Sequence, residues 1–161
     1  MIPTSLKILT RKELEVLLDK WRSENQMIVF TNGVFDLVHL GHVDYLEKAR
    51  NLGDKLIVAL NTDASVKRLK GDNRPISDEQ ARLHVMAAFE FVDATVLFDE
   101  DTPYELISAI KPDILVKGKD YEISNIVGAD IVLENGGSVE TIDIVKGYST
   151  TSIIDKIKRT K

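Results

Sequence analysis

The segment Phe30–Asn61, FTNGVFDLVHLGHVDYLEKARNLGDKLIVALN, decides the fold of this chain because it predicts a loop and a helix between two strands. The apolar run MIVFT at Met27–Thr31 is typical of a strand buried on both faces. The pattern over residues 42–52 is helical, and we expect Gly53 to end that helix in the left-handed conformation. The run KLIVAL at Lys55–Leu60 predicts the next strand. Two strands joined through a helix indicate a parallel pair.

Strand and helix patterns continue to alternate on both sides of this unit. Further strands are expected at ATVLF (94–98), DILVKG (113–118) and SVETIDI (138–144). Capping signals, among them the spacings Thr10/Glu13 and Ser77/Gln80, predict helices at 11–23, after residue 63, at 77–89, from proline 103 and at 149–158. This alternation predicts an α/β protein with a Rossmann-like, open and mostly parallel sheet and helices on both faces. We expect one domain over residues 1–161, made of an N-terminal helical segment (1–25) and a core (26–161).

The composition is that of an acidic globular protein. Of 161 residues, 43% are hydrophobic and 29% charged, and the formal net charge is −5. Such a surface does not attract nucleic acid or anionic lipid, so an anionic substrate must be held by a local group of basic residues. The absence of cysteine excludes thiolate metal sites and fits a reducing cytoplasm. The apolar runs are too short to span a membrane and no signal peptide is evident, so we expect a cytoplasmic protein.

The loop after the first strand has the features of a phosphate-binding site. Helix starts present unpaired backbone N–H groups and partial positive charge, and parallel sheets bind ligands beyond the carboxyl ends of their strands. Gly33 and Gly41 let the backbone approach a ligand closely, and His39 and His42 add imidazole donors. These groups suit nucleotidyl transfer, in which positioning and electrostatics supply most of the catalysis. The alternative is that both histidines are surface or capping residues.

Other site chemistries find little support in the sequence. Neither the phosphate-loop pattern G-x-x-x-x-G-K-[ST] nor the dinucleotide fingerprint G-x-G-x-x-G occurs, and no G-x-S-x-G elbow offers a serine nucleophile. The histidine pair could ligate a metal, but no third ligand has suitable spacing, so we expect no metal held by the protein. A P-loop kinase or a hydride-transfer enzyme is therefore disfavoured.

The motif TNGVFDLVHLGH (31–42) resembles the H-x-G-H signature of the cytidylyltransferase-like superfamily of nucleotidyltransferases. The likeness continues through KRLKGDNRPIS (67–77), KPDILVKGKDY (111–121) and YSTTSIIDKI (148–157), which are similar to the adenylyltransferases of ADP-heptose synthesis. The resemblance implies that ATP and D-glycero-β-D-manno-heptose 1-phosphate give ADP-heptose and pyrophosphate, with Mg²⁺ carried by the nucleotide phosphates. Lys119 and Tyr148 depart from the family pattern, and both bear on the nucleotide pocket.

The resemblance also implies site residues. His39 and His42 would hold the phosphates and stabilise the transition state, while Gly118 and Asp120 fall where the family approaches the base and ribose. The nucleotide-binding set carried over or expected beside the motif is Thr31, Asn32, Gly33, Val34, Phe35, Gly41, Arg82, Lys117, Gly118, Asp120, Ser149, Thr150 and Thr151.

A basic segment follows the second strand of the unit. Four cations, Lys67, Arg68, Lys70 and Arg74, stand close together in a net-acidic chain. One interpretation is a solvated loop; the other, which the resemblance favours, is contact with the triphosphate or the acceptor. Lys70, beside the hinge residue Gly71, is the expected catalytic cation of a loop that closes over the ligand. Arg68 and Arg74 are the expected substrate-binding residues.

Three further residues have a structural and a functional interpretation. Arg82, one turn into a predicted helix, is either a phosphate contact or a surface partner of Asp78. Lys117 ends a predicted strand, where ligand groups gather, but it also fits a lysine that reaches from an apolar stem to solvent. Asp36 is expected to hold its loop through backbone N–H groups rather than take part in chemistry.

Two other functions stay open on the sequence. A cytidylyltransferase acting on glycerol 3-phosphate is the nearest alternative, and a non-catalytic nucleotide-binding module is the other. By analogy with the family we expect a homodimer. Many relatives carry a sugar kinase domain on the same chain and none lies within these 161 residues, so a separate kinase and phosphatase are expected to supply the heptose 1-phosphate.

Overall fold

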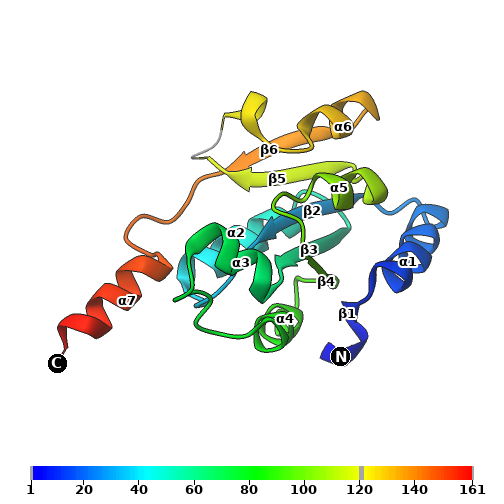
Figure 1. Cartoon of the computed structure of the whole chain (residues 1–161). Coiled ribbons are helices and arrows are strands. Elements are labelled where there is room, and N and C mark those ends of the chain that lie inside the picture. Colours follow the sequence, from blue (N-terminus) through cyan, green and yellow to red (C-terminus); the bar gives the residue numbers. More distant parts are fainter. Residues whose placement is uncertain (1, 120–121, 161) are drawn as a thin grey trace.

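The computed structural model describes residues 2–119 and 122–160, which form a six-stranded sheet (Figure 1). The strands follow the order β1-β4-β3-β2-β5-β6, and each neighbouring pair is parallel. The predicted α/β class and the open parallel sheet are thereby confirmed. The strands are β1 (Ile8–Leu9), β2 (Ile28–Gly33), β3 (Lys55–Asn61), β4 (Ala94–Phe98), β5 (Ile114–Gly118) and β6 (Ser138–Ile142).

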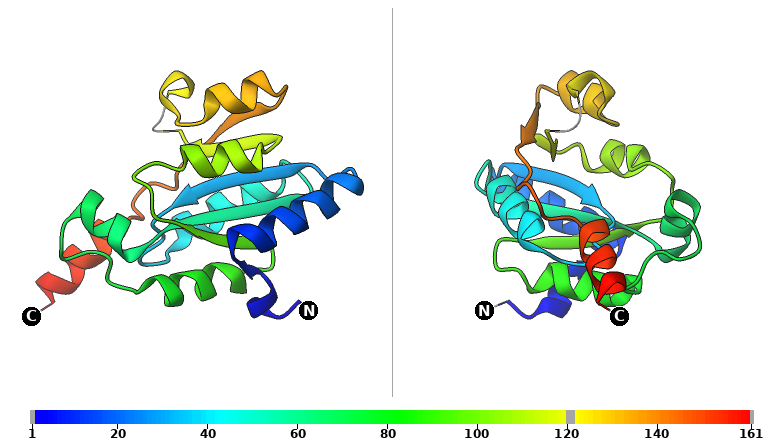
Figure 2. Two further views of the ribbon diagram at one scale, coloured as in Figure 1. Left: turned by 45° about the vertical axis from the view of Figure 1, so that its right-hand side comes forward. Right: turned by 90° about the vertical axis from the view of Figure 1, so that its left-hand side faces the viewer.

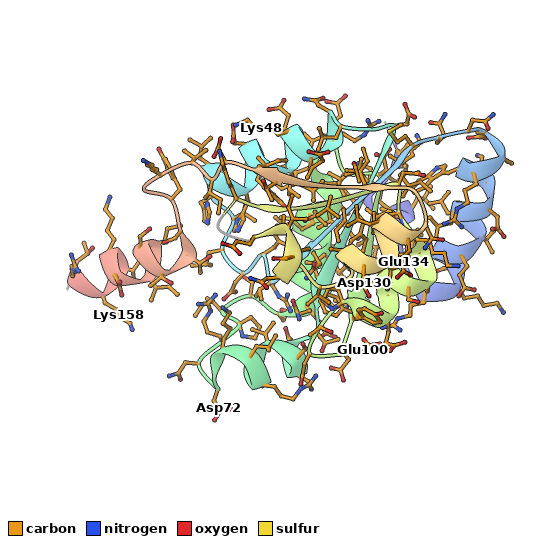
Figure 3. The ribbon with its side chains drawn as sticks, turned by 90° about the horizontal axis from the view of Figure 1, so that it is seen from above. Lys48, Asp72, Glu100, Asp130, Glu134 and Lys158 are labelled. Atoms are coloured by element: carbon orange, nitrogen blue, oxygen red, sulfur yellow. The ribbon has the colours of Figure 1, made fainter. Side chains whose placement is uncertain are left out.

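Helices cover both faces of this sheet. Figure 3 shows α2, which carries Lys48, on the opposite side of the molecule from α6, which carries Asp130 and Glu134. Two short 3₁₀ helices, η1 and η2, span residues 4–6 and 123–125. The α-helices are α1 (Arg11–Ser23), α2 (Leu40–Arg50), α3 (Asp63–Lys70), α4 (Glu79–Ala88), α5 (Tyr104–Ile110), α6 (Ala129–Glu134) and α7 (Thr150–Arg159).

The central strands are buried on both faces, as their apolar runs predict. In β2, Val29 belongs to the core that α2 and α4 cover, and Phe30 belongs to the core beneath α1, α5 and α6. In β3, Val58 belongs to the first of these cores and Ile57 to the second. Because side chains alternate along a strand, one continuous apolar run supplies both cores at once.

The starts of the first and last helices follow their predicted capping signals. Thr10 and Glu13 form the expected capping box of α1, with each side chain bonded to the other's backbone N–H. Ser149 caps α7 in the same way together with Ser152. The start of α5 differs slightly, because Pro103 precedes the helix instead of forming its first residue.

The predicted capping residue of α4 is wrong by one position. The helix is capped by Asp78, whose carboxylate accepts the Ala81 N–H, rather than by Ser77. The Ser77 N–H is bonded to Asp36 in a neighbouring loop, and the Ser77 carbonyl accepts from Arg82. Ser77 is therefore held by tertiary contacts just outside the helix.

Three other local predictions need correction. Gly53 is not left-handed; a Cβ there would come within 2.7 Å of Val29 Cγ2 and 2.9 Å of the Met27 carbonyl oxygen, so close packing requires the glycine. The basic residues 67–70 form the last turn of α3 and not part of a loop, so the connection to α4 begins only at Gly71. Strand β1 was not predicted, since two residues carry no periodic pattern.

The sheet order creates a crevice beside β2. This strand lies between β3 and β5, so the chain proceeds outward in opposite directions from it. Such a switch point leaves room for a ligand at the carboxyl ends of the strands. Figures 1 and 2 show that α7 lies beyond that end of the sheet. No helix among the described residues combines the length and apolar character that crossing a bilayer requires.

Candidate active site

A cavity of about 470 Å³ opens at the carboxyl ends of β2 and β5, where the switch point predicts a ligand. It reaches from the loop after β2 to the first residues of α2 and α7 and to the last residue of α3. It is lined by Asn32, Gly33, Val34, Phe35, His39, Gly41, His42, Tyr45, Lys70, Lys117, Gly118, Ile144, Tyr148, Ser149 and Thr150. Most of the predicted site residues therefore meet in one place.

The loop between β2 and α2, residues 34–39, leads into a stacked pair of imidazoles, and we name it the histidine loop. The rings of His39 and His42 lie 3.9 Å apart between centroids, at an interplanar angle of 21°. Phe35, in the left-handed conformation at φ 49°, presents its ring to His42 edge-on at 5.3 Å. A Cβ on Gly41 would come within 3.0 Å of the His39 ring. Glycine at position 41 therefore makes room for the stack.

The imidazole pair is kept neutral by its surroundings. The Nδ1 atoms of His39 and His42 are buried and have no hydrogen-bond partner among the described residues. Burial lowers the pKa of His39. Burial, together with the adjacent His39, lowers the pKa of His42 to about 4. Two neutral rings with unused ring nitrogens at a helix start are suited to an anionic ligand, which would favour their protonated form.

Two lysines enter the cavity from different elements. Lys70 is the last residue of α3, and Lys117 lies near the end of β5. The Lys117 ammonium donates to the side-chain oxygen of Asn32, and it lies 3.4 Å from the Asn32 carbonyl oxygen. This bond joins β5 to the first residues of the cavity wall. The acidic chain thus gathers positive charge where an anionic ligand would need it.

The start of α7 closes one side of the cavity. Ser149 and Thr150 line it, and the Thr150 hydroxyl lies 3.4 Å from the Leu37 carbonyl oxygen of the histidine loop. Thr151 does not line the cavity; it borders a separate hollow together with Arg74. Helix α7 extends away from the body of the molecule, as the position of Lys158 shows in Figure 3.

Thr31 lies behind the cavity wall rather than on it. Its buried hydroxyl lies 2.7 Å from the Tyr45 hydroxyl and 3.1 Å from the Val116 carbonyl oxygen. Tyr45, which the sequence reasoning missed, also donates to Val116 and reaches the cavity from α2. Its position one turn after His42 on the same helix face is the signal that could have found it. Ile144 was missed as well, and no local pattern marks it.

The three predicted arginines, Arg68, Arg74 and Arg82, do not line the cavity. Arg68 lies on the outer side of α3, where Nε donates to Asp101 at 3.0 Å and the guanidinium pairs with Asp99. Arg74 Nε donates to the Asp36 carboxylate at 2.6 Å. The structural role expected for Asp36 is confirmed, because its carboxylate also accepts two backbone N–H groups.

Arg82 is fully buried, and its guanidinium is bonded to other groups of the protein. Its guanidinium donates to the carbonyl oxygens of Ser77, Val34 and Asn61 at 2.7–3.0 Å. It also pairs with Asp63 at 2.8 Å, and not with Asp78 as the surface interpretation expected. Its place in the predicted nucleotide-binding set therefore conflicts with its contacts. Asp120, another member of that set, lies outside the described residues.

The cavity offers little to a metal ion. No carboxylate is found among the described residues that line it. Across the described residues, no group of three or more histidine, aspartate or glutamate side chains is placed to hold a metal. A divalent ion would have to be brought by a ligand and share its oxygens with amide or hydroxyl groups of the wall.

A parallel sheet with a switch-point cavity built on paired imidazoles at a helix start defines a nucleotidyltransferase-like α/β protein. The model of the cytidylyltransferase-like family matches residues 30–156. The chain belongs to this family.

Curated relatives of similar sequence are bifunctional HldE proteins. That of Campylobacter jejuni is 59% identical over 155 residues, and that of Koribacter versatilis is 54% identical over 150 residues. These alignments cover 96% and 93% of this chain but only 32% and 31% of the relatives. The chain thus spans about a third of the length of the curated relatives it matches.

Two solved structures share the fold. The lipopolysaccharide core biosynthesis protein from Thermoplasma volcanium is 33% identical with a TM-score of 0.60, and the match covers 77% of this chain and 99% of that one. Pantoate-β-alanine ligase from Francisella tularensis is 15% identical with a TM-score of 0.59, over 94% of this chain and 76% of that one. At that identity the second match supports the fold alone.

Proposed function

We propose that this chain transfers AMP from ATP to a sugar 1-phosphate, D-glycero-β-D-manno-heptose 1-phosphate, and releases pyrophosphate. The observation that carries the proposal is the stacked imidazole pair at the start of α2. Its buried Nδ1 atoms have no partner among the described residues, which suits them to a polyphosphate that enters the cavity.

The reaction forms one bond and breaks one. A phosphate oxygen of the sugar attacks the α-phosphorus of ATP, and the bond from that phosphorus to the oxygen bridging to the β-phosphate breaks. Pyrophosphate leaves with the bonding electrons, so negative charge grows on it in the transition state. His39 and His42 donate to this charge and Lys70 neutralises it from α3, while no side chain acts as a nucleophile.

The remaining cavity residues bind and orient the nucleotide in this proposal. The backbone of residues 32–35 and the glycines 41 and 118 let the nucleotide lie against the wall, since little side-chain bulk intervenes. Ser149 and Thr150, at the start of α7, contact the β- and γ-phosphates. Lys117 supports the wall through Asn32. Mg²⁺ is carried by the nucleotide phosphates and offsets their charge.

The heptose assignment rests on similarity and not on the cavity. Resemblance to the adenylyltransferases of ADP-heptose synthesis covers nearly the whole chain. The same assignment is supported by the HldE relatives at 54–59% identity and by the Thermoplasma volcanium protein named for lipopolysaccharide core biosynthesis. The similarity favours this acceptor over glycerol 3-phosphate.

Pyrophosphate release with defined substrates tests the proposal. ATP and CTP are each offered with heptose 1-phosphate and with glycerol 3-phosphate, and ATP with heptose 1-phosphate is expected to turn over fastest. Turnover confined to CTP with glycerol 3-phosphate would replace the proposal with the cytidylyltransferase alternative. No pyrophosphate with any pair would leave a nucleotide-binding module without catalysis.

Variants of the imidazole pair test the assignment of the site. We expect His39→Ala and His42→Ala each to lower kcat about 100-fold, because a preorganised donor to the developing charge is lost. His84→Ala is the control, since His84 is exposed on α4. Unchanged turnover in both cavity variants would remove the histidines from the chemistry.

Location and assembly complete the proposal. We expect the protein to act in the cytoplasm, where ATP is supplied and where a chain without cysteine fits the redox conditions. We also expect a homodimer on the basis of the family resemblance. Light scattering checks this, because a dimer has twice the 18.0 kDa mass of one chain.

A further inference from the structure

The carboxylate of Asp36 links the histidine loop to a segment far along the chain. Its side chain has no exposed area. It accepts from Arg74 Nε at 2.6 Å and from the backbone N–H groups of Ile76 and Ser77 at 2.8 Å each. Burial alone would raise the pKa of Asp36, but these hydrogen bonds together outweigh it and hold the pKa below its ordinary value. The link is therefore charged at neutral pH, and all its donors come from residues 74–77.

A second set of contacts joins the same two segments. The guanidinium of Arg82 donates to the Val34 carbonyl oxygen at 2.7 Å and to the Ser77 carbonyl oxygen at 3.0 Å. The histidine loop and residues 74–77 are thus held together at two points. The Arg82 contacts fix the backbone from within the core, whereas Arg74 lies nearer the surface, with 20% of its side chain exposed.

One of the joined segments carries part of the candidate active site, and the other follows Lys70 closely in the chain. Phe35, beside Asp36, packs its ring edge against His42, and the same loop leads to His39. On the other side, the turn from Gly71 to Arg74 follows Lys70 directly, and its Arg74 N–H donates to the Gly71 carbonyl oxygen at 3.1 Å.

This turn has little packing of its own. Gly71 adopts φ 92°, and a Cβ there would meet nothing within 4 Å. Packing at Gly71 therefore does not hold the turn, and the contact of Arg74 with Asp36 anchors its far end. Arg74 itself borders the hollow beside Thr151 and not the cavity.

We propose that Arg74 is a positioning residue that, through Asp36, sets the separation of the imidazole pair from Lys70 across the cavity without touching the substrate. The inference rests on the proposed function and adds to it, because the role implied for Arg74 by resemblance is substrate binding. A substrate phosphate would have to compete with a buried carboxylate 2.6 Å from Arg74 Nε, which makes direct binding the poorer explanation.

The first test needs no turnover. Ring-proton NMR signals of the three histidines are compared between the wild type and Arg74→Gln, with exposed His84 as the internal reference. Loss of the link should move the signals of His39 and His42, since stacked rings shift each other's resonances strongly, and leave that of His84 in place. Arg74→Lys, which keeps a cation near Asp36, should give intermediate shifts.

A matched control uses a similar ion pair at the other end of the sheet. Arg50 Nε donates to Asp93 at 2.9 Å, and Asp93 also accepts the Leu56 N–H at 2.8 Å. Arg50→Gln should leave the signals of all three histidines unmoved. If Arg74→Gln and Arg74→Lys also leave the His39 and His42 signals unmoved, the proposal is overturned.

The second test is kinetic. Arg74→Gln should lower kcat about tenfold while each KM stays within about twofold, because alignment is lost and binding is not. If Lys70 is already misplaced, adding Lys70→Ala to Arg74→Gln should cost at most about threefold, against about tenfold in the wild type. Arg50→Gln should leave kcat unchanged.

The outcomes separate the two proposals. Equal costs of Lys70→Ala in both backgrounds, or a raised KM for the sugar phosphate at unchanged kcat, would overturn the positioning role. If the wild type releases no pyrophosphate, the proposed function fails, and the NMR comparison still decides whether Arg74 holds the imidazole pair.

Discussion

Single residues of the cavity show how burial can prepare a side chain for an anion. The pKa of His42 is lowered to about 4 by its burial and by His39, so the ring is neutral in the free protein at neutral pH. In the unfolded chain a histidine has an ordinary pKa of 6.5. Between these two values the unfolded state binds a proton that the folded state does not.

The stability of the protein should therefore fall as the pH drops from 6.5 towards 4. The direction follows because a lowered histidine pKa favours the unfolded state wherever that state alone is protonated. His42→Gln should flatten this slope, whereas His84→Gln is the control for an exposed histidine. Urea unfolding at a series of pH values measures how the free energy of unfolding changes with pH. An unchanged slope in His42→Gln would contradict the assigned pKa.

A substitution at Gly41 tests whether the stacking of the two histidines affects catalysis independently of stability. Gly41→Ala adds a Cβ only 3.0 Å from the His39 ring, so the ring must move. Alanine is favoured over glycine within a helix by about 1 kcal/mol, which offsets the cost of moving the ring. We expect kcat/KM to fall at least about tenfold while the melting temperature holds. A fall in melting temperature alone would show that the residue serves packing only.

At the scale of elements, α7 combines a helix cap with a candidate phosphate contact in one residue. Ser149 accepts the Ser152 N–H as the cap, and it lines the cavity. Ser149→Ala should cost about 1 kcal/mol of helix stability through the lost cap and weaken nucleotide binding as well.

Ser149→Asp separates the two roles. Aspartate caps helices as well as serine, so circular dichroism should show an intact α7, but its charge should repel the triphosphate. We expect nucleotide affinity, measured by calorimetry, to fall further than in Ser149→Ala. Nucleotide affinity equal to that of the wild type would remove Ser149 from the phosphate site.

Sequence patterns predicted the elements whose signals are local. Strands β2 to β6 have apolar runs, and α1 and α7 have capping boxes at their starts, so their positions could be predicted closely. Strand β1 could not, because two residues pair with a distant strand. The two histidines were predicted as a pair at one site, but the spacing of the motif predicts neither their stacking at 3.9 Å nor the left-handed backbone at Phe35.

Arginine side chains mark the limit of prediction from sequence. Arg68 and Arg74 belong to the basic segment and Arg82 was assigned by resemblance, yet each is engaged by acceptors that lie elsewhere in the chain. Arg82 binds carbonyl oxygens from three segments, and no pattern around residue 82 indicates them. Such contacts are decided by tertiary packing, which a local motif does not contain.

At the scale of the whole molecule, the central sheet is buried and α7 is not. Residues 56–61 of β3 are buried, whereas no residue of α7 is. Amide hydrogen exchange, measured by mass spectrometry, should therefore be much slower in β3 than in α7. ATP should slow exchange at the start of α7 and leave its last turn unchanged. Equal protection of α7 and β3 without ligand would contradict this description.

The position of β1 at the sheet edge has a consequence for biosynthesis. Ile8 lies opposite Thr95, and Leu9 lies opposite Val96, although β1 leaves the ribosome long before β4 does. Pairings between distant residues form late, because the intervening chain must first be made and folded. We expect ribosome-bound chains that stop short of residue 98 to leave these two residues accessible to proteases. The earliest strand to be translated is then among the last to join the native structure.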